Sequence, residues 1–533
     1  MRITKRIIPI LLFALGLSLF AAGAAAQTAT TGTIEGTVTD VNGAVVPGVT
    51  VTVTSPNLIR AQSATTDDEG RFRVLNLPPG KYSVTIESAR GFSKFEQKDV
   101  EVNLSKTSSV EVRLAPEGAA ASVDITSSAG ATVDTSSNTT GSNVSTDQFS
   151  NFPTTRTVQG LYTIAPTVAR SGLRDSAGRD RDPSVAGSSG PENNYILDGV
   201  NTTDPAFGGS GANLPFEFVQ EVEIKTGAYG AEYGKSTGGI FNVITKSGGN
   251  DFRGDAFAYF TTKSLVRETK NFPFLGAAPN GFSEIDAGFD IGGPIKKDKL
   301  WFFGAFNPQR RKNFFLGQFF KTPDENQVTT PFYSGKLTWG INQNNTFTFS
   351  TFGDFTKQEG FLFGNTGFGA DPASFRGTLE TGGHNYTARL NSTITPTFIG
   401  EFSFGMHFQR ANTIPDASVA NSPAFVDRFV VVKNGAVLPV IQSGIDSGGS
   451  VGFVDYVNGA GGILQRNYTR SGNANIFNST QDRNRFEFQA RMQNIYGRHT
   501  FKYGFEYNRN IYKIDTTSSG PAQTFKNAAG TDS

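Results

Sequence analysis

The stretch from 227 to 248 reads GAYGAEYGKSTGGIFNVITKSG, a glycine-rich loop that leads into a short apolar segment. The triplet GKS at 234–236 looks like the end of a phosphate-binding loop. Such a loop needs a glycine five residues before position 234, and Tyr229 stands there. The glycine pair at 238–239 also breaks the helix whose N-terminus would bind phosphate. The stretch therefore predicts a turn followed by a β-strand, and we discard a nucleotide site.

Two segments upstream have the pattern of short strands. Residues 194–200 read NYILDGV, a strand that runs into an Asp-Gly turn, and residues 219–227 alternate as VQEVEIKTG. Together with 227–248 they resemble the plug domain of TonB-dependent outer-membrane receptors, which we expect over residues 133–251. The residues that carry the resemblance are Leu197, Asp198, Gly199, Tyr229, Tyr233, Gly234, Gly238, Gly239 and Asn242. Many plugs have an Ile-Arg-Gly triplet before the Asp-Gly turn, but residues 185–187 read Val-Ala-Gly, so no arginine role is carried over.

The N-terminus has the three parts of a secretory signal. Arg2, Lys5 and Arg6 precede an apolar run, and small residues with an Ala-x-Ala site end at position 26. The apolar run is shorter than the ~20 residues that span a bilayer as a helix. We expect residues 1–26 to be cleaved after export.

Residues 27–116 predict a small β-sandwich of about seven strands. Valines alternate with threonines from 49 to 54, and turn residues recur every 8–12 positions. The segment DDEG at 67–70 lacks further calcium ligands, so it predicts a hairpin turn. The run GTVTDVNG at 36–43, PGVTV at 47–51 and LPPGKY at 77–82 resembles the carboxypeptidase regulatory-like domain, an accessory module of transthyretin-like or carbohydrate-binding-like fold without peptidase chemistry.

A polar linker follows at 117–132, with one short extended patch of alternating apolar residues. An extended patch of this kind is suited to adding a strand to the sheet edge of a partner, although it could also be a last sandwich strand. Its place before the plug matches the TonB box of the receptor family, and it lacks the usual acidic start. The candidate box consists of Ser122, Val123, Asp124, Ile125 and Thr126.

Residues 252–533 predict part of an outer-membrane β-barrel. Of the 47 phenylalanines, 11 lie before position 252 and 36 lie from position 252 onward. Phe501, Tyr503 and Phe505 alternate with polar residues, and a second strand alternates over 398–409. Short turns near 297, 343, 396 and 497 alternate with long connections at 261–281, 312–328, 359–382 and 414–483. Short turns that alternate with long loops are the barrel pattern. His407 then faces the lumen in a structural role.

We count about nine strands in this region, an odd number, whereas plugged transporters close at ~22 strands. We expect a curved open sheet and a sequence that covers the N-terminal portion of a longer protein. The expected fold is mainly β: a small N-terminal β-sandwich, an α+β plug domain and an incomplete antiparallel transmembrane β-barrel.

Composition excludes several functions. The 48 basic and 47 acidic residues balance, which argues against a nucleic-acid partner. The chain has no cysteine, and its three histidines are far apart, so we expect no catalytic residue, no metal ligand and no cofactor. We predict that the protein is not an enzyme.

The resemblance implies a transporter in the cell outer membrane, with the N-terminal domain in the periplasm. It would take up a scarce small molecule, glycan or peptide, driven by the TonB energy-transduction complex of the inner membrane. Membrane lipid and the barrel-assembly machinery are further implied partners. The alternatives are an Oar-like barrel for adhesion or protein export, and a secreted carbohydrate-binding β-protein. Candidate ligand-loop residues are Arg170, Arg174, Arg179 and Arg181.

Overall fold

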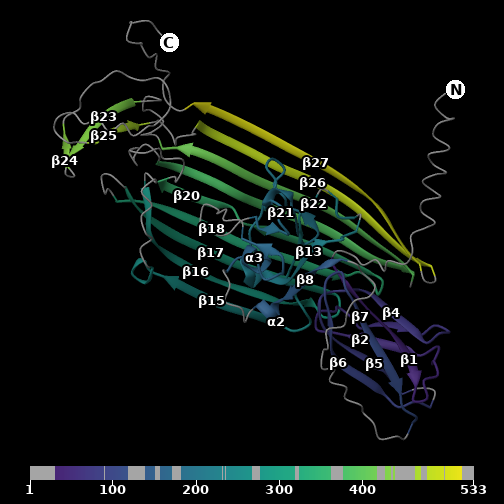
Figure 1. The fold of residues 1–533 in the computed structure, drawn as a ribbon. Coiled ribbons are helices and arrows are strands. Elements are labelled where there is room, and N and C mark those ends of the chain that lie inside the picture. The colour runs from purple at the N-terminus through teal and green to yellow at the C-terminus, as the bar shows by residue number, and fades with distance from the viewer. Residues whose placement is uncertain are drawn as a thin grey trace, which may run out of the picture.

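A computed structural model describes residues 30–88, 91–117, 139–149, 156–170, 182–230, 232–234, 236–266, 277–317, 323–361, 376–395, 397–416, 426–433, 436–438, 463–469, 477–496 and 499–518. The expected signal peptide lies outside them. Three units follow one another along the chain: an N-terminal sandwich, a central unit and a large curved sheet, which we call the wall (Figure 1). Among the described residues, no helix has both the length and the apolar character needed to cross a membrane.

The N-terminal sandwich has the seven strands that the sequence predicts. One sheet has the order β4-β1-β7 and the other the order β3-β2-β5-β6. Val51, Val53 and Val84 are fully buried between them, as period-two alternation requires. The Asp67 carboxylate accepts hydrogen bonds from the backbone N–H groups of Glu69 and Arg71, which makes the segment a hairpin turn. The strands are β1 Gly32–Asp40, β2 Thr50–Thr54, β3 Gln62–Thr65, β4 Arg71–Leu77, β5 Gly80–Ile86, β6 Phe95–Val102 and β7 Thr107–Leu114.

The central unit is built on a five-stranded sheet of order β12-β11-β14-β13-β8. Short helices contact β13, and the rings of Tyr162, Tyr195 and Phe241 pack together in the core, with centroids 4.3 Å and 5.2 Å from Phe241. The strand β8, which follows the linker, forms one edge. Its elements include β8 Thr140–Ser145, α2 Thr146–Phe149, α3 Val158–Tyr162, β9 Val168–Ala169, β11 Asn194–Leu197, β12 Val200–Asn201, β13 Val219–Gly227 and β14 Ile240–Thr245.

The wall contains ten antiparallel strands. The strands β19 and β20 both pair with β18 and β21 and follow one another along the same row between them, so the sheet is nine strands wide. β15 and β27 are its edges, and among the described strands nothing joins them, which gives the open sheet that we expect. The strands are β15 Arg253–Thr261, β16 Ala277–Lys296, β17 Leu300–Gly317, β18 Pro323–Gly340, β19 Asn345–Gly353, β20 Thr356–Phe361, β21 Arg376–Thr395, β22 Phe398–Pro415, β26 Phe477–Tyr496 and β27 His499–Ser518.

The wall strands run further than the predicted loops allow. The expected loop at 312–328 is wrong, because β17 and β18 stay paired up to Leu316 and Pro323. Charges within this segment pair across the hairpin, with Lys312 Nζ 2.7 Å from Glu325 Oε1. A membrane strand needs only ~9–11 residues, so hairpins of this length continue beyond the hydrocarbon layer.

Polar residues make up most of the buried face of the wall, and apolar residues make up most of its exposed face. On β22, Glu401 is 2% exposed and His407 is fully buried, whereas Phe404 is 43% exposed. Phe505 on β27 is 62% exposed. A water-soluble sandwich would bury the phenylalanines, so this inverted arrangement is that of a membrane barrel whose polar side faces inward.

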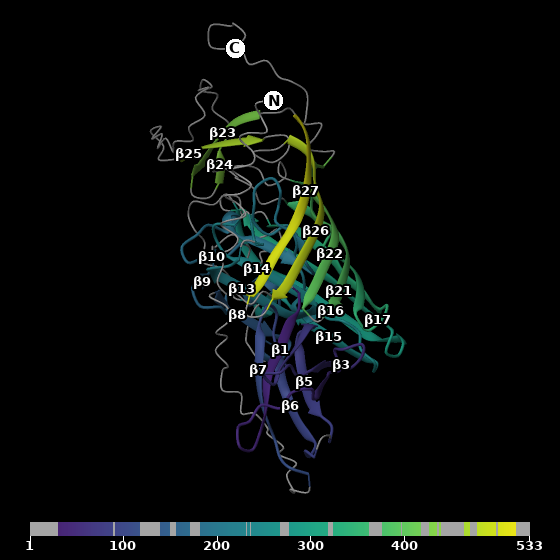
Figure 2. The same cartoon turned by 90° about the vertical axis from the view of Figure 1, so that its right-hand side faces the viewer.

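The central unit lies against the concave, polar side of the wall, and the N-terminal sandwich lies at one end of the long strands (Figures 1 and 2). Arg60 of the sandwich reaches that end, since its Nε donates to the Asp298 carbonyl in the β16–β17 turn, 2.9 Å away. A separate small sheet of order β24-β23-β25 is formed by β23 Val426–Lys433, β24 Ala436–Leu438 and β25 Ile463–Thr469.

Candidate functional site

The predicted Asp-Gly turn is the point where the central unit meets the wall. Asp198 and Gly199 both have positive φ, 46° and 83°, and join β11 to β12 as a two-residue hairpin, which favours glycine at the second place. The Asp198 carboxylate accepts from the Thr245 backbone N–H at 3.0 Å and the Thr245 hydroxyl at 2.6 Å. Lys336 Nζ from the wall lies 3.0 Å from the same carboxylate. The turn thus ends in a buried ion pair.

The glycine-rich stretch forms the loop that precedes β14. The Tyr229 hydroxyl donates to the carbonyls of Ser236 and Gly238, at 3.1 Å and 3.2 Å. Gly239 lies so close to Val185 that an added Cβ would be 2.7 Å from the Val185 side chain, which explains the glycine there. Among the other motif residues, Leu197 and Tyr233 are buried, Gly234 accepts from Asn194, and Asn242 donates to Glu223. The motif residues thus lie around β11 and β14, with the Asp198 turn at one end of these strands and the glycine-rich loop at the other.

Charged side chains of the wall hold the central unit. Each pair joins a wall strand to a loop or strand of the central unit, and most of the partners are buried. The contact also has an apolar part, because Phe303, Ala305, Phe332 and Phe352 of the wall belong to the same buried cluster as the core of the central unit. The pairs, with N···O distances, are Lys336–Asp198 at 3.0 Å, Asp290–Lys246 at 2.9 Å, Asp286–Arg156 at 2.9 Å, Arg483–Asp204 at 2.5 Å and Lys502–Glu232 at 2.6 Å.

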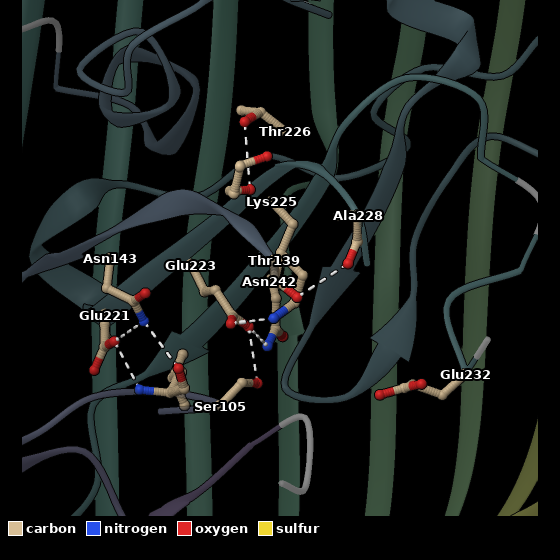
Figure 3. A network of polar contacts seen from close by, with 12 residues as sticks. Ser105, Thr139, Asn143, Glu221, Glu223, Lys225, Thr226, Ala228, Glu232 and Asn242 are labelled. Carbon is tan, nitrogen blue, oxygen red and sulfur yellow. Dashed lines mark hydrogen bonds and ion pairs between the residues drawn. The ribbon is translucent and has the colours of Figure 1, made fainter. Parts of the chain in front are cut away.

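A second polar cluster joins the N-terminal sandwich to the central unit (Figure 3). Glu221 Oε1 accepts from the Leu104 backbone N–H at 2.9 Å and from the Asn143 amide at 2.6 Å. The Ser105 hydroxyl donates to Glu223 at 3.1 Å. The loop that follows β6 is therefore docked on β13, beside the first strand of the central unit.

Both carboxylates of this cluster are almost completely removed from water, with Glu221 1% and Glu223 2% exposed. Glu223 is balanced by Lys225, whose ammonium contacts it. Glu221 has no cationic partner in the part of the chain that the structure describes. Burial, with a smaller contribution from the charge of Glu223, raises the pKa of Glu221 to about 8, although the hydrogen bonds from Asn143 and Leu104 act in the opposite direction.

Replacing Glu221 with glutamine tests this docking. The Glu221 pKa is raised from 4.5 to about 8, so the folded state holds the proton more tightly. The proton on Glu221 therefore stabilises the folded state at pH 4, and this contribution is lost as the pH rises towards 8. We expect Glu221→Gln to match the wild type at pH 5 and to be more stable by roughly 1–3 kcal/mol at pH 9. Hydrogen exchange of residues 103–106 measures this, with exposed Glu111→Gln as the control. A variant less stable at pH 9 would contradict it.

The predicted ligand-loop arginines are mostly outside the described residues. Arg170 is exposed just after β9. Arg174, Arg179 and Arg181 lie outside the described residues, as does the candidate box from Ser122 to Thr126. These assignments stay predictions. The described residues contain no group of three metal-ligating side chains.

Three family models match successive parts of the chain. They are the carboxypeptidase regulatory-like domain at residues 33–115, the TonB-dependent receptor plug domain at 131–240 and an outer membrane beta barrel domain at 244–314. The three matches follow the order of the sandwich, the central unit and the wall.

Individual proteins match as well. The TonB-dependent transporter Oar of Myxococcus xanthus is 32% identical over 419 residues, 69% of this chain and 38% of Oar. The ferrienterobactin receptor of Escherichia coli (strain K12) is 30% identical over 161 residues, 27% of this chain and 21% of the receptor. The outer membrane transporter YddB from Escherichia coli shares the fold with a TM-score of 0.52 at 13% identity, over 74% of this chain and 51% of YddB.

The chain thus spans less than half the length of the curated relatives it matches. Within that span, the sandwich, the glycine-rich plug motif and the inside-out wall occur together and in the order of the matching models. By these domains and its similarity to Oar, the chain belongs to the TonB-dependent receptor family.

Proposed function

We propose that this protein is an outer-membrane transporter that takes up a scarce ligand with energy delivered by TonB. One observation carries the proposal: a folded unit lies on the mainly polar side of a sheet whose outer side is apolar, and buried ion pairs hold it there together with an apolar contact. No backbone ladder among the described strands joins the sheet of the central unit to the wall. We therefore infer that the central unit acts as a plug, which can leave or rearrange while the strand pairing of the wall stays intact.

The position of β8 supports coupling to a pull on the linker. β8 is the first strand after the linker and an edge strand, paired only with β13 among the described strands. Two hydroxyl contacts at its start join it to the end of β13: Thr139 to the Ala228 carbonyl and Thr226 to the Thr140 carbonyl, both 3.3 Å. Tension from the linker would reach this edge first and remove it from the sheet.

In this mechanism a ligand binds on the outer side and shifts the plug, and the box at Ser122 to Thr126 becomes available. TonB then pairs with the box as an added strand, and pulling opens a path through the wall. The chain would be exported by its signal, inserted by the barrel-assembly machinery and surrounded by lipid, with the sandwich in the periplasm. The similarity to the transporter Oar and to the ferrienterobactin receptor supports active uptake, and the ligand is a small molecule, glycan or peptide.

Proline in the box tests the coupling. Val123→Pro removes a backbone donor from the added strand, so we expect energised uptake to be lost and ligand binding to be kept. Host cells that carry the whole gene are first screened for the compound whose uptake restores growth, and uptake of that compound is then measured. Ala129→Pro, in the same linker but outside the box, is the control. Unchanged uptake in Val123→Pro would show that the TonB box does not lie at residues 122–126.

A further inference from the structure

The N-terminal sandwich is attached to the end of the wall by hydrogen bonds to several strands. Arg60 joins two wall turns, because its Nε donates to the Asp298 carbonyl at 2.9 Å and one Nη group donates to the Gly340 carbonyl at 3.4 Å. The amide of Asn76 donates to the Thr393 hydroxyl on β21 at 3.2 Å. These acceptors lie at or next to the ends of β16, β18 and β21, so the sandwich spans a large part of this end of the wall.

The attachment to the wall also has buried contacts. Ile59 is buried and packs against Gly340, where an added Cβ would lie 3.0 Å from the Ile59 Cγ2 atom. The Thr30 hydroxyl donates to the Glu401 carboxylate on β22 at 3.3 Å, and both of these residues are buried. The sandwich therefore cannot leave the wall without breaking several contacts at once.

The sandwich also holds β8, the first strand after the linker. The amide of Asn143 on β8 donates to the Leu104 carbonyl at 3.1 Å and to Glu221 Oε1 at 2.6 Å, and Glu221 in turn accepts from the Leu104 backbone N–H (Figure 3). Lys81 Nζ lies 2.9 Å from Asp147 Oδ2 in α2, directly after β8. One face of the sandwich thus contacts the start of the central unit while another contacts the wall.

The central unit itself holds β8 only weakly. β8 is an edge strand that pairs with β13 alone among the described strands, and Val144 is its only buried residue. Segments with few buried apolar contacts open more easily than the core of a protein. The contacts with the sandwich are therefore a substantial part of what keeps β8 in the sheet.

We propose that the N-terminal sandwich is a clamp: it holds β8 against β13 by bracing it on the wall, and β8 leaves the sheet only after the sandwich has undocked. Most of its contacts are single hydrogen bonds, each of which contributes little net stability, so the clamp can open and close. The linker leaves the sandwich after β7 and enters β8, so a pull on it loads the clamp and β8 together. That TonB supplies this pull rests on the proposed function, whereas the clamp itself does not.

Hydrogen exchange of the full-length protein in detergent tests the clamp. Arg60→Met removes the bonds to two wall turns and changes no contact of β8. We expect it to increase the undocked population, and with it the exchange of residues 103–106, roughly tenfold. Because β8 opens only from the undocked state, exchange of residues 140–145 should rise by the same factor. Arg73→Met is the matched control and should change neither segment, since Arg73 pairs with Glu35 inside the sandwich.

A disulfide between the sandwich and the wall tests the clamp in the opposite direction. A Cβ built on Gly340 would lie 3.8 Å from the Ile59 Cβ, within the ~3.5–4.5 Å that a disulfide needs. In the double variant Ile59→Cys with Gly340→Cys, oxidation ties the sandwich to the wall. We expect exchange of residues 103–106 and of residues 140–145 to slow by roughly tenfold or more, and reductant to reverse the effect.

The two segments must respond together. The proposal is overturned if exchange of residues 140–145 does not follow that of residues 103–106 in either experiment, because β8 would then open independently of the sandwich. It is also overturned if Arg73→Met acts as strongly as Arg60→Met, because the effect would then be one of sandwich stability. Neither experiment uses a transported ligand or TonB, so a failure of the clamp is distinguishable from a failure of the proposed function.

Discussion

Replacing Lys336 with methionine is expected to lower the free energy of unfolding of the central unit by about 3–5 kcal/mol. The substitution leaves the Asp198 carboxylate, 3% exposed, with hydrogen bonds from Thr245 but without its cation. Methionine keeps the length of the side chain, so the loss comes from an unpaired buried charge and not from a cavity. Hydrogen exchange of β14, which carries Thr245, measures the loss.

The matched control is Lys312→Met in the same wall. Lys312 pairs with Glu325, but both side chains are about half exposed, at 43% and 50%. Exposed pairs contribute ~0–1 kcal/mol, so little should change. The double variant Asp198→Asn with Lys336→Met removes both charges and should recover most of the stability. A Lys336→Met variant no less stable than Lys312→Met would show that the ion pair does not hold the central unit.

Local patterns of the sequence predict where most wall strands lie and which faces they have, but not how far the β17–β18 hairpin extends. Alternation of Phe501, Tyr503 and Phe505 with polar residues gives the two faces of β27. The Asp-Gly pair after an apolar run predicts the turn at Asp198, because only a few residue types accept positive φ. Such signals depend on neighbouring residues alone, which is why they can be read from one sequence.

The contacts that form the site could not be predicted in this way. Glu221 and Glu223 alternate with Val222 and Ile224, a pattern that normally places the carboxylates in water. They are buried because a loop 117 residues earlier in the chain covers them. Asp198 and Lys336 are likewise 138 residues apart. Periodicity carries no information on which distant segment covers a polar face.

A disulfide between the central unit and the wall is expected to prevent the plug from leaving. Val200 on β12 faces Gly405 on β22, and a Cβ built on Gly405 would lie 3.2 Å from the Cβ of Val200. Disulfides need ~3.5–4.5 Å between these atoms, so a shift of a few tenths of an ångström suffices. The chain has no cysteine of its own, so Val200→Cys with Gly405→Cys can form only this bond within it. We expect uptake to be lost under oxidising conditions and restored by reductant.

Force measurement tests the central claim, that the plug unravels from a stable wall when its linker is pulled. The full-length double-cysteine variant is held in a bilayer and pulled by a handle at residues 122–126. The reduced protein should extend up to Arg253, where the wall begins, while the disulfide should stop extension at Val200, 253 − 200 = 53 residues earlier. This shortens the extension by at most roughly 190 Å. Equal extension in both states, or rupture of wall strands before the central unit extends, would contradict the account.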